Sequence, residues 1–263
     1  MVNVTLSNRE LAGRVALVVG GSSGIGYSAA LLMARRGARV AILADRGVQA
    51  ALDLAATDSV TLMGISGDAS HSEVLKAAIE QIVQAYGAIH ITVHTAAIHP
   101  YGNAGDTSEA TWDRVMAVNL KSVYLLAHWV LPHMLRQGDG AIINVSSVQG
   151  SANQREVSAY ATSKAAILGF TRTLAVDYTE KGIRALSVSP GSIRTPLLDL
   201  SVEKFGKGRS KEEVLESWGQ AAPAKRIGEP HEVAEVIAFA ASPRASYCSG
   251  SELVVDGGLS VQL

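Results

Sequence analysis

A tyrosine, a lysine and a serine are the residues of this chain best suited to chemistry. Tyr160 and Lys164 stand four residues apart, and Ser147 precedes the tyrosine by thirteen residues. On a helix, residues i and i+4 share a face, so the ammonium group would lie beside the phenol. A unit charge about 4 Å away at an effective dielectric near 20 is worth about 4 kcal/mol. That would lower the phenol's pKa by about three from its usual value of about 10. The pair predicts an acid/base tyrosine, although an exposed helix pair formed by chance is the alternative for these residues alone.

The composition excludes several classes of protein. The 263 residues are 48% hydrophobic, which suits one large α/β domain. With 23 basic and 24 acidic side chains and no basic block, we expect no nucleic-acid partner. The single cysteine, Cys248, excludes an intrachain disulfide and a cysteine metal cluster, so we expect a cytoplasmic protein without a metal. The first 14 residues lack a signal-peptide pattern, and no window of about 18 uninterrupted apolar residues predicts a membrane span.

Short apolar runs alternate with longer segments of helical period. Strands are predicted at 15–19, 40–44, 60–65, 89–95, 141–146, 184–189 and 253–255, and helices at 25–36, 72–86, 109–137, 158–180 and 230–241. Several runs are apolar on both faces, as in a buried parallel sheet. We therefore predict a single α/β domain over 1–263, with a doubly wound (Rossmann-like), mostly parallel seven-stranded sheet, helices on both faces and ligands at the carboxyl ends of the strands.

The segment 197–223 interrupts this alternation with polar residues and a short predicted helix at 211–218. Long insertions over a ligand crevice often act as lids. A solvated surface excursion is an equally good interpretation of the same residues. The sequence leaves both open.

A glycine-rich turn follows the first predicted strand and leads into a helix. It reads Gly20-Gly21-Ser22-Ser23-Gly24-Ile25-Gly26. Glycines let the backbone approach a pyrophosphate, and a helix N-terminus offers free N–H groups and partial positive charge. An ordinary βα loop is the alternative, but its place after the first strand favours a dinucleotide site.

Acidic residues at the next two strand ends refine this prediction. Asp45 follows the second strand, where a carboxylate can accept hydrogen bonds from an adenosine ribose and repel a 2′-phosphate, which favours NAD. Arg46 could instead bind that phosphate. Asp68, after the third strand, is placed to meet the adenine edge or to cap the following helix.

Together these motifs resemble those of the short-chain dehydrogenase/reductase family over nearly the full length. The matching residues are Gly20-x-x-x-Gly24-x-Gly26, Asp68, Asn119, Ser147, Tyr160 with Lys164, Pro190-Gly191-Ser192-Ile193-Arg194-Thr195 and Val255-Asp256-Gly257-Gly258. The resemblance implies a nicotinamide cofactor and a catalytic group of Asn119, Ser147, Tyr160 and Lys164. It also implies an NAD(P)-dependent oxidoreductase that interconverts a secondary alcohol and a ketone, and a homo-oligomer, either dimer or tetramer.

The resemblance assigns further roles around the cofactor. Tyr160 would be the general acid/base, Lys164 would lower its pKa and hold the nicotinamide ribose, and Ser147 would bind the reacting oxygen. Asn119 would hold a water that links the lysine to solvent, or simply interrupt its helix. The expected cofactor-binding residues are Gly20, Ser22, Ser23, Gly24, Ile25, Gly26, Asp45, Asp68, Ala69, Ala96, Tyr160, Lys164, Pro190, Gly191, Ile193 and Thr195.

Two departures from the family pattern stand near the predicted site. Val19 occupies the place of a threonine whose hydroxyl would tie the glycine turn to a neighbouring strand. The segment His94-Thr95-Ala96-Ala97 replaces the family's Asn-Asn-Ala-Gly. His94 is expected either to replace the asparagine hydrogen bond or to pack.

The substrate site is predicted from residues near the reactive tyrosine. Ser147, Gln149, Gln154 and Tyr160 are the candidates, and the polar stretch 153–156 favours a small polar substrate such as a sugar, polyol or hydroxylated ring. A 3-oxoacyl-thioester reductase is the alternative enzyme. A nicotinamide-dinucleotide-binding sensor without turnover is the alternative outside enzymes.

Overall fold

Seven parallel strands form the sheet found within the described residues. The computed structural model describes residues 9–262, and its strands pair in the order β3-β2-β1-β4-β5-β6-β7. The strands are β1 (Val15–Val19), β2 (Arg39–Ala44), β3 (Leu62–Ser66), β4 (Ile91–His94), β5 (Gly140–Val145), β6 (Ile183–Pro190) and β7 (Glu252–Val255). Residues 1–8 and 263 of the predicted domain lie outside the described part. The doubly wound sheet is confirmed, and its order reverses between β1 and β4.

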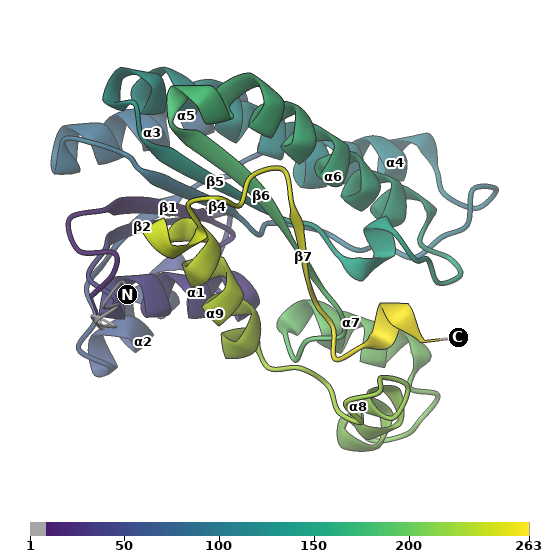
Figure 1. Ribbon diagram of the computed structural model, residues 1–263. Helices are drawn as coiled ribbons and strands as arrows, with labels where there is room; N and C mark the ends of the chain where they lie inside the picture. The colour runs from purple at the N-terminus through teal and green to yellow at the C-terminus, as the bar shows by residue number, and fades with distance from the viewer. Residues whose placement is uncertain (1–8, 263) are drawn as a thin grey trace, which may run out of the picture.

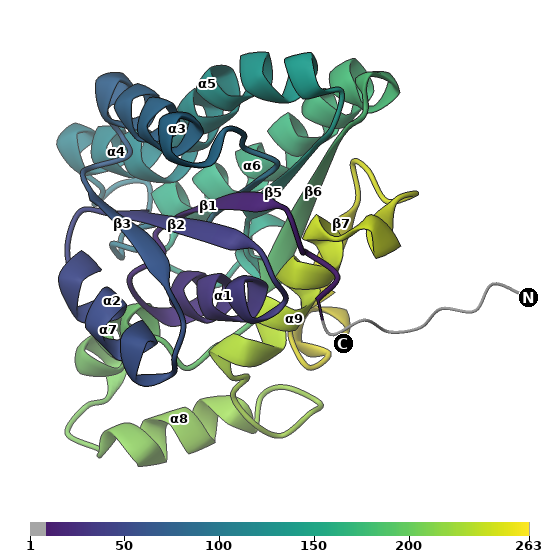
Figure 2. The ribbon, with the colours of Figure 1, turned by 90° about the vertical axis from the view of Figure 1, so that its left-hand side faces the viewer.

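Helices cover both faces of the sheet (Figure 1). One layer contains α3 (Ser72–Tyr86), α4 (Glu109–Val115), α5 (Ser122–Gln137) and α6 (Ser158–Tyr178), and the other contains α1 (Gly24–Arg35), α2 (Val48–Thr57) and α9 (Pro230–Ala241). Figure 2 shows the sheet between these layers from its β3 edge. The short helix α2, between β2 and β3, was not predicted.

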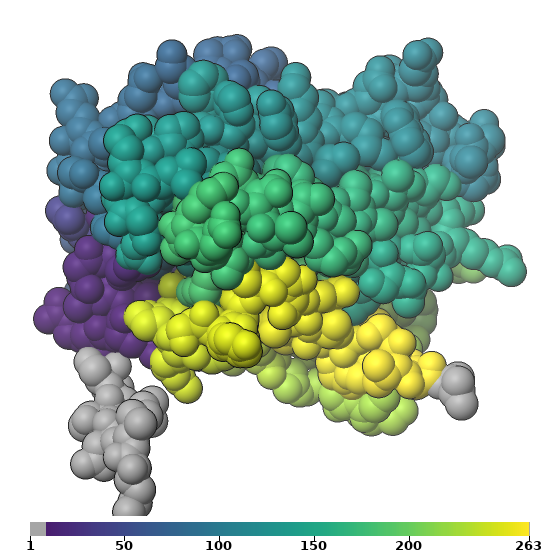
Figure 3. Space-filling view, turned by 45° about the horizontal axis from the view of Figure 1, so that its top comes forward, coloured from purple at the N-terminus to yellow at the C-terminus, as the bar shows by residue number. Residues whose placement is uncertain are grey.

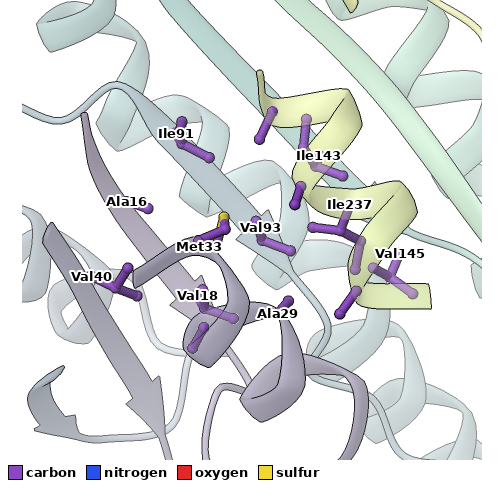
Figure 4. Packing of buried hydrophobic residues seen from close by; sticks show 14 of the residues in the cluster. Ala16, Val18, Ala29, Met33, Val40, Ile91, Val93, Ile143, Val145 and Ile237 are labelled. Atoms are coloured by element: carbon purple, nitrogen blue, oxygen red, sulfur yellow. The ribbon is translucent and has the colours of Figure 1, made fainter. Parts of the chain in front are cut away.

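Alternate residues of the buried strands supply two cores, one on each face of the sheet. In β1, Ala16 and Val18 pack toward α1 and α9, whereas Val15, Leu17 and Val19 pack toward α3 and α5. Figure 4 shows the first core, where Met33 of α1 and Ile237 of α9 lie against the strands. Burying one large aliphatic side chain stabilises the folded state by roughly 1.5–3 kcal/mol relative to leaving it exposed. Burial on both sides explains why β1 is apolar on both of its faces.

The carboxyl ends of four neighbouring strands bring the predicted motifs together. Because β1, β4, β5 and β6 are consecutive and parallel, these ends meet at one edge of the sheet. The first two lead into Gly20 and Thr95, β5 is followed by Ser146 and Ser147, and β6 ends at Pro190. Residues from distant parts of the sequence are therefore held side by side by the sheet.

The predicted helix over 109–137 is one run whose hydrogen-bond pattern changes in the middle. A π-helical turn, Met116–Lys121, separates α4 from α5. By length and composition the run Glu109–Gln137 could cross a membrane, but half of its most apolar window is buried inside the fold. Core helices of soluble proteins often have the same length and composition, so this run is weak evidence for a membrane span.

The polar insertion folds into two helices, α7 (Pro196–Phe205) and α8 (Lys211–Gly219), set apart from the sheet in Figures 1 and 2. Ser210 and Glu213 form a reciprocal capping box at the start of α8. Val202, Val214, Leu215 and Ile227 make a small separate core beneath these helices. The helix predicted at 211–218 is present, and α7 was not predicted.

Candidate active site

The serine, tyrosine and lysine singled out by the sequence meet at the carboxyl end of β5. Tyr160 and Lys164 lie in the first turns of α6 and are buried, with exposed fractions of 7% and 2%. Ser147 is hydrogen-bonded to Tyr160. The Lys164 Nζ atom donates to the carbonyl of Val145 over 2.9 Å and lies 5.5 Å from the centroid of the Tyr160 ring. The predicted i, i+4 neighbours therefore do share one buried face.

A second contact joins β5 to α6 behind these groups. Ser146 donates its hydroxyl to the carbonyl of Lys164 at 2.8 Å. Gly150 packs so closely on the same helix that a Cβ there would lie 3.1 Å from the Lys164 carbonyl oxygen. The segment that follows β5 therefore packs directly against α6 beside Lys164.

The predicted lowering of the Tyr160 pKa is not present in this structure. Burial raises the pKa of Tyr160 to about 12, and the hydrogen bond from Ser147 opposes that rise only in part. Burial also lowers the pKa of Lys164 to about 7, so its charge is only partly present at neutral pH. The predicted lowering applies to a fully charged lysine beside a solvated phenol, and here both groups are buried. Desolvation is the largest cause of the shift in both groups.

Asn119 sits inside the π turn and is fully buried. Its side-chain Oδ1 accepts from the backbone N–H of Ile98 at 2.9 Å, and its Nδ2 donates to the Ile98 carbonyl at 3.0 Å and to Ser163 Oγ at 3.1 Å. π turns recur at functional sites because the extra residue redirects side chains. Here the amide holds the backbone of the loop that follows β4. The predicted water contact stays a prediction.

The two departures from the family pattern fit together. Thr95 donates its hydroxyl toward the carbonyls of Val19 and Gly20, at 2.9 and 3.2 Å. A hydroxyl therefore does join the glycine turn to the neighbouring strand β4. It belongs to Thr95, which follows β4, and not to residue 19 at the end of β1. The exchange compensates for the valine at position 19.

His94 makes a hydrogen bond as well as packing. Its Nε2 lies 2.7 Å from Ser122 Oγ at the start of α5, and the imidazole is 1% exposed. Since the serine hydroxyl donates to the Val118 carbonyl, the histidine nitrogen must be the donor of this pair. Burial, helped by the charge of Lys164, lowers the pKa of His94 to about 3. A neutral histidine therefore links β4 to the π turn.

The glycine turn is shaped to let another group approach its backbone. Gly20 has φ of 81°, which favours glycine, and a Cβ placed on Gly26 would lie 2.2 Å from the Gly20 carbonyl oxygen. The turn opens into a cleft of about 400 Å³ that runs to the ends of β2 and β3. Its free N–H groups and its length suit a dinucleotide. The residues present fit the predicted cofactor.

Most of the predicted cofactor residues line this cleft. Those that do are Gly20, Ser22, Ser23, Gly24, Ile25, Gly26, Asp45, Asp68, Ala69, Ala96 and Thr195. Tyr160, Lys164, Pro190, Gly191 and Ile193 are not among its lining residues. Arg46, the alternative partner for a 2′-phosphate, also lines the cleft. So do residues that were not predicted to bind the cofactor, notably Ser70, Thr95, Ile98, Arg114 and Leu197. Arg114 could not be predicted from a local motif, because it lies in α4, 46 residues after Asp68, whose carboxylate it binds.

Asp45 and Asp68 stand at the far end of the cleft. The Asp45 side chain is 58% exposed, and its carboxylate lies 3.9 Å from the guanidinium of Arg46. Asp68 accepts from the backbone N–H of Ser70 and from Arg114, at 2.9 and 2.8 Å. Although burial raises the pKa of Asp68, these hydrogen bonds hold it at about 2. Both carboxylates are therefore positioned to accept hydrogen bonds.

A stack of rings extends from the tyrosine toward the insertion. The imidazole centroid of His99 lies 4.0 Å from that of Tyr160 and 4.5 Å from that of Tyr101. Tyr101 meets Phe205 of α7 edge-on at 4.6 Å and donates its hydroxyl to Ser201 at 2.6 Å. The insertion therefore contacts the reactive tyrosine through two intervening rings. No motif or spacing in the sequence indicated this stack.

The predicted substrate residues differ in their surroundings. Gln149 lies in a short 3-10 turn after Ser147, and its Oε1 is buried without a hydrogen-bond partner among residues 9–262. Gln154 is exposed, in a loop where Glu156 has φ of 61°. The role of both stays a prediction. Over the same described range, no three His, Cys, Asp or Glu side chains are grouped to hold a metal.

Comparisons with known proteins cover nearly the whole chain. A family model described as enoyl-(acyl carrier protein) reductase matches residues 19–260. An uncharacterized oxidoreductase of Thermotoga maritima is 38% identical over 249 residues, 94% of this chain and 97% of that protein. A cyclohexanol dehydrogenase of Acinetobacter sp. is 36% identical over 252 residues, 93% and 94% of the two chains. The ligand-free structure of Thermoplasma acidophilum aldohexose dehydrogenase matches with a TM-score of 0.89 at 35% identity, over 97% of each chain.

Proposed function

Because the chain belongs to the short-chain dehydrogenase/reductase family and is an NAD(P)-dependent oxidoreductase acting on CH–OH groups, we propose that it interconverts a secondary alcohol and a ketone on a small polar substrate. Tyr160 is the general acid/base of this proposal. The observation that carries it is the buried cluster in which Ser147 hydrogen-bonds Tyr160 while Lys164 lies beneath the same ring. Such a cluster is needed for proton transfer and not for binding alone.

The residues of the cluster have separate roles in the proposal. In the direction of reduction, the protonated phenol of Tyr160 donates its proton to the carbonyl oxygen of the substrate. In the direction of oxidation, the phenolate accepts the hydroxyl proton and is stabilised by Ser147 and the Lys164 ammonium. A bound nicotinamide supplies the hydride chemistry at its C4 position. Asn119 holds the Ile98 backbone and so fixes the loop above the ring of Tyr160.

We assign NAD as the preferred dinucleotide. The exposed carboxylate of Asp45, at the end of β2, supports this choice because it would accept hydrogen bonds from a ribose diol and repel a 2′-phosphate. Arg46 faces the same end of the cleft and argues the other way. Catalytic efficiencies with NAD and NADP separate the two, and a large NADP preference would overturn the role of Asp45.

The insertion is proposed as the substrate lid. Tyr101 supports this role because it bonds Ser201 of α7, and Lys204 Nζ lies 4.8 Å from the centroid of the Tyr101 ring. Closing contacts of this kind exclude water from a site. The lid covers the tyrosine through the ring stack, which agrees with the low exposure of Tyr160.

An oligomer is proposed from exposed apolar residues on two surfaces. On α5 and α6, Tyr124 and Val176 are 49% and 82% exposed, and near the C-terminus Val254 and Val261 are 50% and 82% exposed. In Figure 3 the C-terminal segment lies beside the end of α6 and β6. Symmetric contacts through such faces are the usual route to dimers and tetramers. Sedimentation equilibrium tests this, and a monomer at working concentration would contradict it.

A substrate panel tests the proposed reaction. Purified protein is incubated with NAD or NADP and with secondary alcohols, cyclic diols, sugars and a 3-hydroxyacyl thioester, and the absorbance of the reduced cofactor is followed. We expect oxidation of small polar secondary alcohols. Turnover confined to the thioester would favour the acyl reductase, and cofactor binding without any turnover across the panel would favour a sensor.

A further inference from the structure

The ring stack over the tyrosine leaves one buried polar atom without a partner. His99 Nε2 has no hydrogen-bond partner among residues 9–262 and is buried from solvent. An unsatisfied buried donor or acceptor costs about 1–3 kcal/mol. Natural sites keep such groups where a ligand satisfies them.

The faces of this imidazole are already occupied. One ring neighbour, Tyr160, lies at 4.0 Å and the other, Tyr101, at 4.5 Å, at tilts of 31° and 39°. A ligand therefore cannot stack on His99 and reaches it only at the edge, where the nitrogens are. The backbone just before it is held by two hydrogen bonds from Asn119 to Ile98, so the ring has a fixed support.

The imidazole is neutral at working pH. Burial, followed by the charge of Lys164, lowers the pKa of His99 to about 4. A neutral imidazole nitrogen either donates or accepts, according to its tautomer. A hydroxyl group can do both, so it is the ligand group that satisfies Nε2 in either tautomer. A carbonyl or an ammonium could serve only one.

We infer that His99 is a specificity-determining residue that binds a second hydroxyl of the substrate, on the carbon next to the one that reacts. The inference rests on the proposed function, because it takes the reacting oxygen to be the one held by Tyr160. The ring centroids of His99 and Tyr160 are 4.0 Å apart, so groups bound at their polar edges must be close neighbours in the substrate. The substrate class is then the vicinal diols and the corresponding α-hydroxyketones.

Gln149 offers a second point of attachment. Its Oε1 is also buried without a partner among the described residues, and its backbone N–H is held by Ser147 Oγ at 3.2 Å. An amide oxygen can accept a hydrogen bond from a substrate hydroxyl, whereas an unsubstituted hydrocarbon ring has no donor for it. Two unsatisfied polar atoms beside the Ser147 and Tyr160 pair favour a substrate that is more polar than a simple cyclic alcohol.

The test compares a matched pair of substrates, cis-1,2-cyclohexanediol and cyclohexanol, in wild type and in His99→Phe. Phenylalanine keeps an aromatic ring in the stack and removes the nitrogen. We expect kcat/KM for the diol to fall about 10-fold to 100-fold, in line with a hydrogen bond lost at a buried group, and kcat/KM for cyclohexanol to change less than about 3-fold. His99→Gln, which retains a polar edge, should recover part of the loss for the diol.

The outcomes separate the inference from the proposed reaction. If wild type oxidises both alcohols and His99→Phe lowers both equally, His99 is only structural and the inference is wrong, while the proposed function stands. If wild type turns over other alcohols of the panel but neither of these two, the inference is wrong and the proposed function stands. If wild type turns over no member of the panel in either direction, both fail.

A readout without turnover completes the test. In protein labelled with 15N-histidine and saturated with NADH, adding cis-1,2-cyclohexanediol should shift one imidazole Nε2 resonance that is absent from His99→Phe. Cyclohexanol should leave that resonance in place. An unmoved resonance at saturating diol would contradict the inference whatever the kinetics show.

Discussion

The hydroxyl of Thr95 is the contact through which this chain compensates for a valine at position 19. It donates toward the carbonyls of Val19 and Gly20 at 2.9 and 3.2 Å, joining the end of β4 to the glycine turn. Thr95→Val removes the hydroxyl and keeps the shape of the side chain. Thr92→Val is a matched control, because Thr92 is fully buried in β4, three residues before Thr95, and its hydroxyl has no partner among the described residues.

The expected magnitude follows from the two carbonyls. A net hydrogen bond contributes about 0.5–1.5 kcal/mol, and an acceptor left unsatisfied costs about 1–3 kcal/mol. We expect Thr95→Val to lower the free energy of unfolding by about 1–3 kcal/mol. The space is also tight, since a Cβ on Gly26 would lie 2.4 Å from Thr95 Oγ1. A methyl group there should displace the turn and weaken NAD binding about 10-fold, which corresponds to about 1.4 kcal/mol.

Urea denaturation and fluorescence titration with NADH measure the two effects. Thr92→Val should leave cofactor affinity unchanged and should not destabilise the fold, and Thr95→Ser should stay close to wild type. If Thr95→Val proves as harmless as Thr92→Val in both assays, the compensation between positions 19 and 95 does not exist.

Three other changes have defined outcomes. Asp45→Ala should lower kcat/KM with NAD and raise it with NADP, each by about 10-fold; an unchanged ratio would contradict the assignment of Asp45. Lys164 has a folded pKa of about 7, below its unfolded value, so the unfolded state binds more protons between about pH 7 and 10 and stability should rise with pH there. Lys164→Met should lack that rise in urea denaturation. Asn119→Ala should lower the free energy of unfolding by about 2–4 kcal/mol, because it leaves the Ile98 N–H and carbonyl unpaired; a loss below about 0.5 kcal/mol would argue against this support.

The sheet and the residues of the cluster could be predicted from local patterns. Strands apolar on both faces indicate a parallel sheet, and the i, i+4 spacing of Tyr160 and Lys164 places both on one face of α6. Parallel strand ends meet at one edge, which brings Ser147 beside them. These properties depend on neighbouring residues in the sequence, and the structure agrees with them.

Other features depend on contacts that spacing does not reveal. The π turn around Asn119 has the same apolar period as an α-helix, so the run was predicted as one regular helix. Thr95 contacts a residue 76 positions away, and the stack of His99 with Tyr160 and Tyr101 exists only once β4 and α6 are assembled. The pKa of Tyr160 differs from the sequence prediction because burial raises it, and burial is a property of the whole fold.

The central claim is that Tyr160 transfers the proton during turnover, and Tyr160→Phe tests it most directly. The variant keeps the ring that His99 contacts and lacks only the hydroxyl. With NADH binding equal to that of wild type in fluorescence titration, kcat for the best alcohol of the panel should fall about 100-fold to 10,000-fold. Turnover close to the wild-type rate, with cofactor still bound, would contradict the claim.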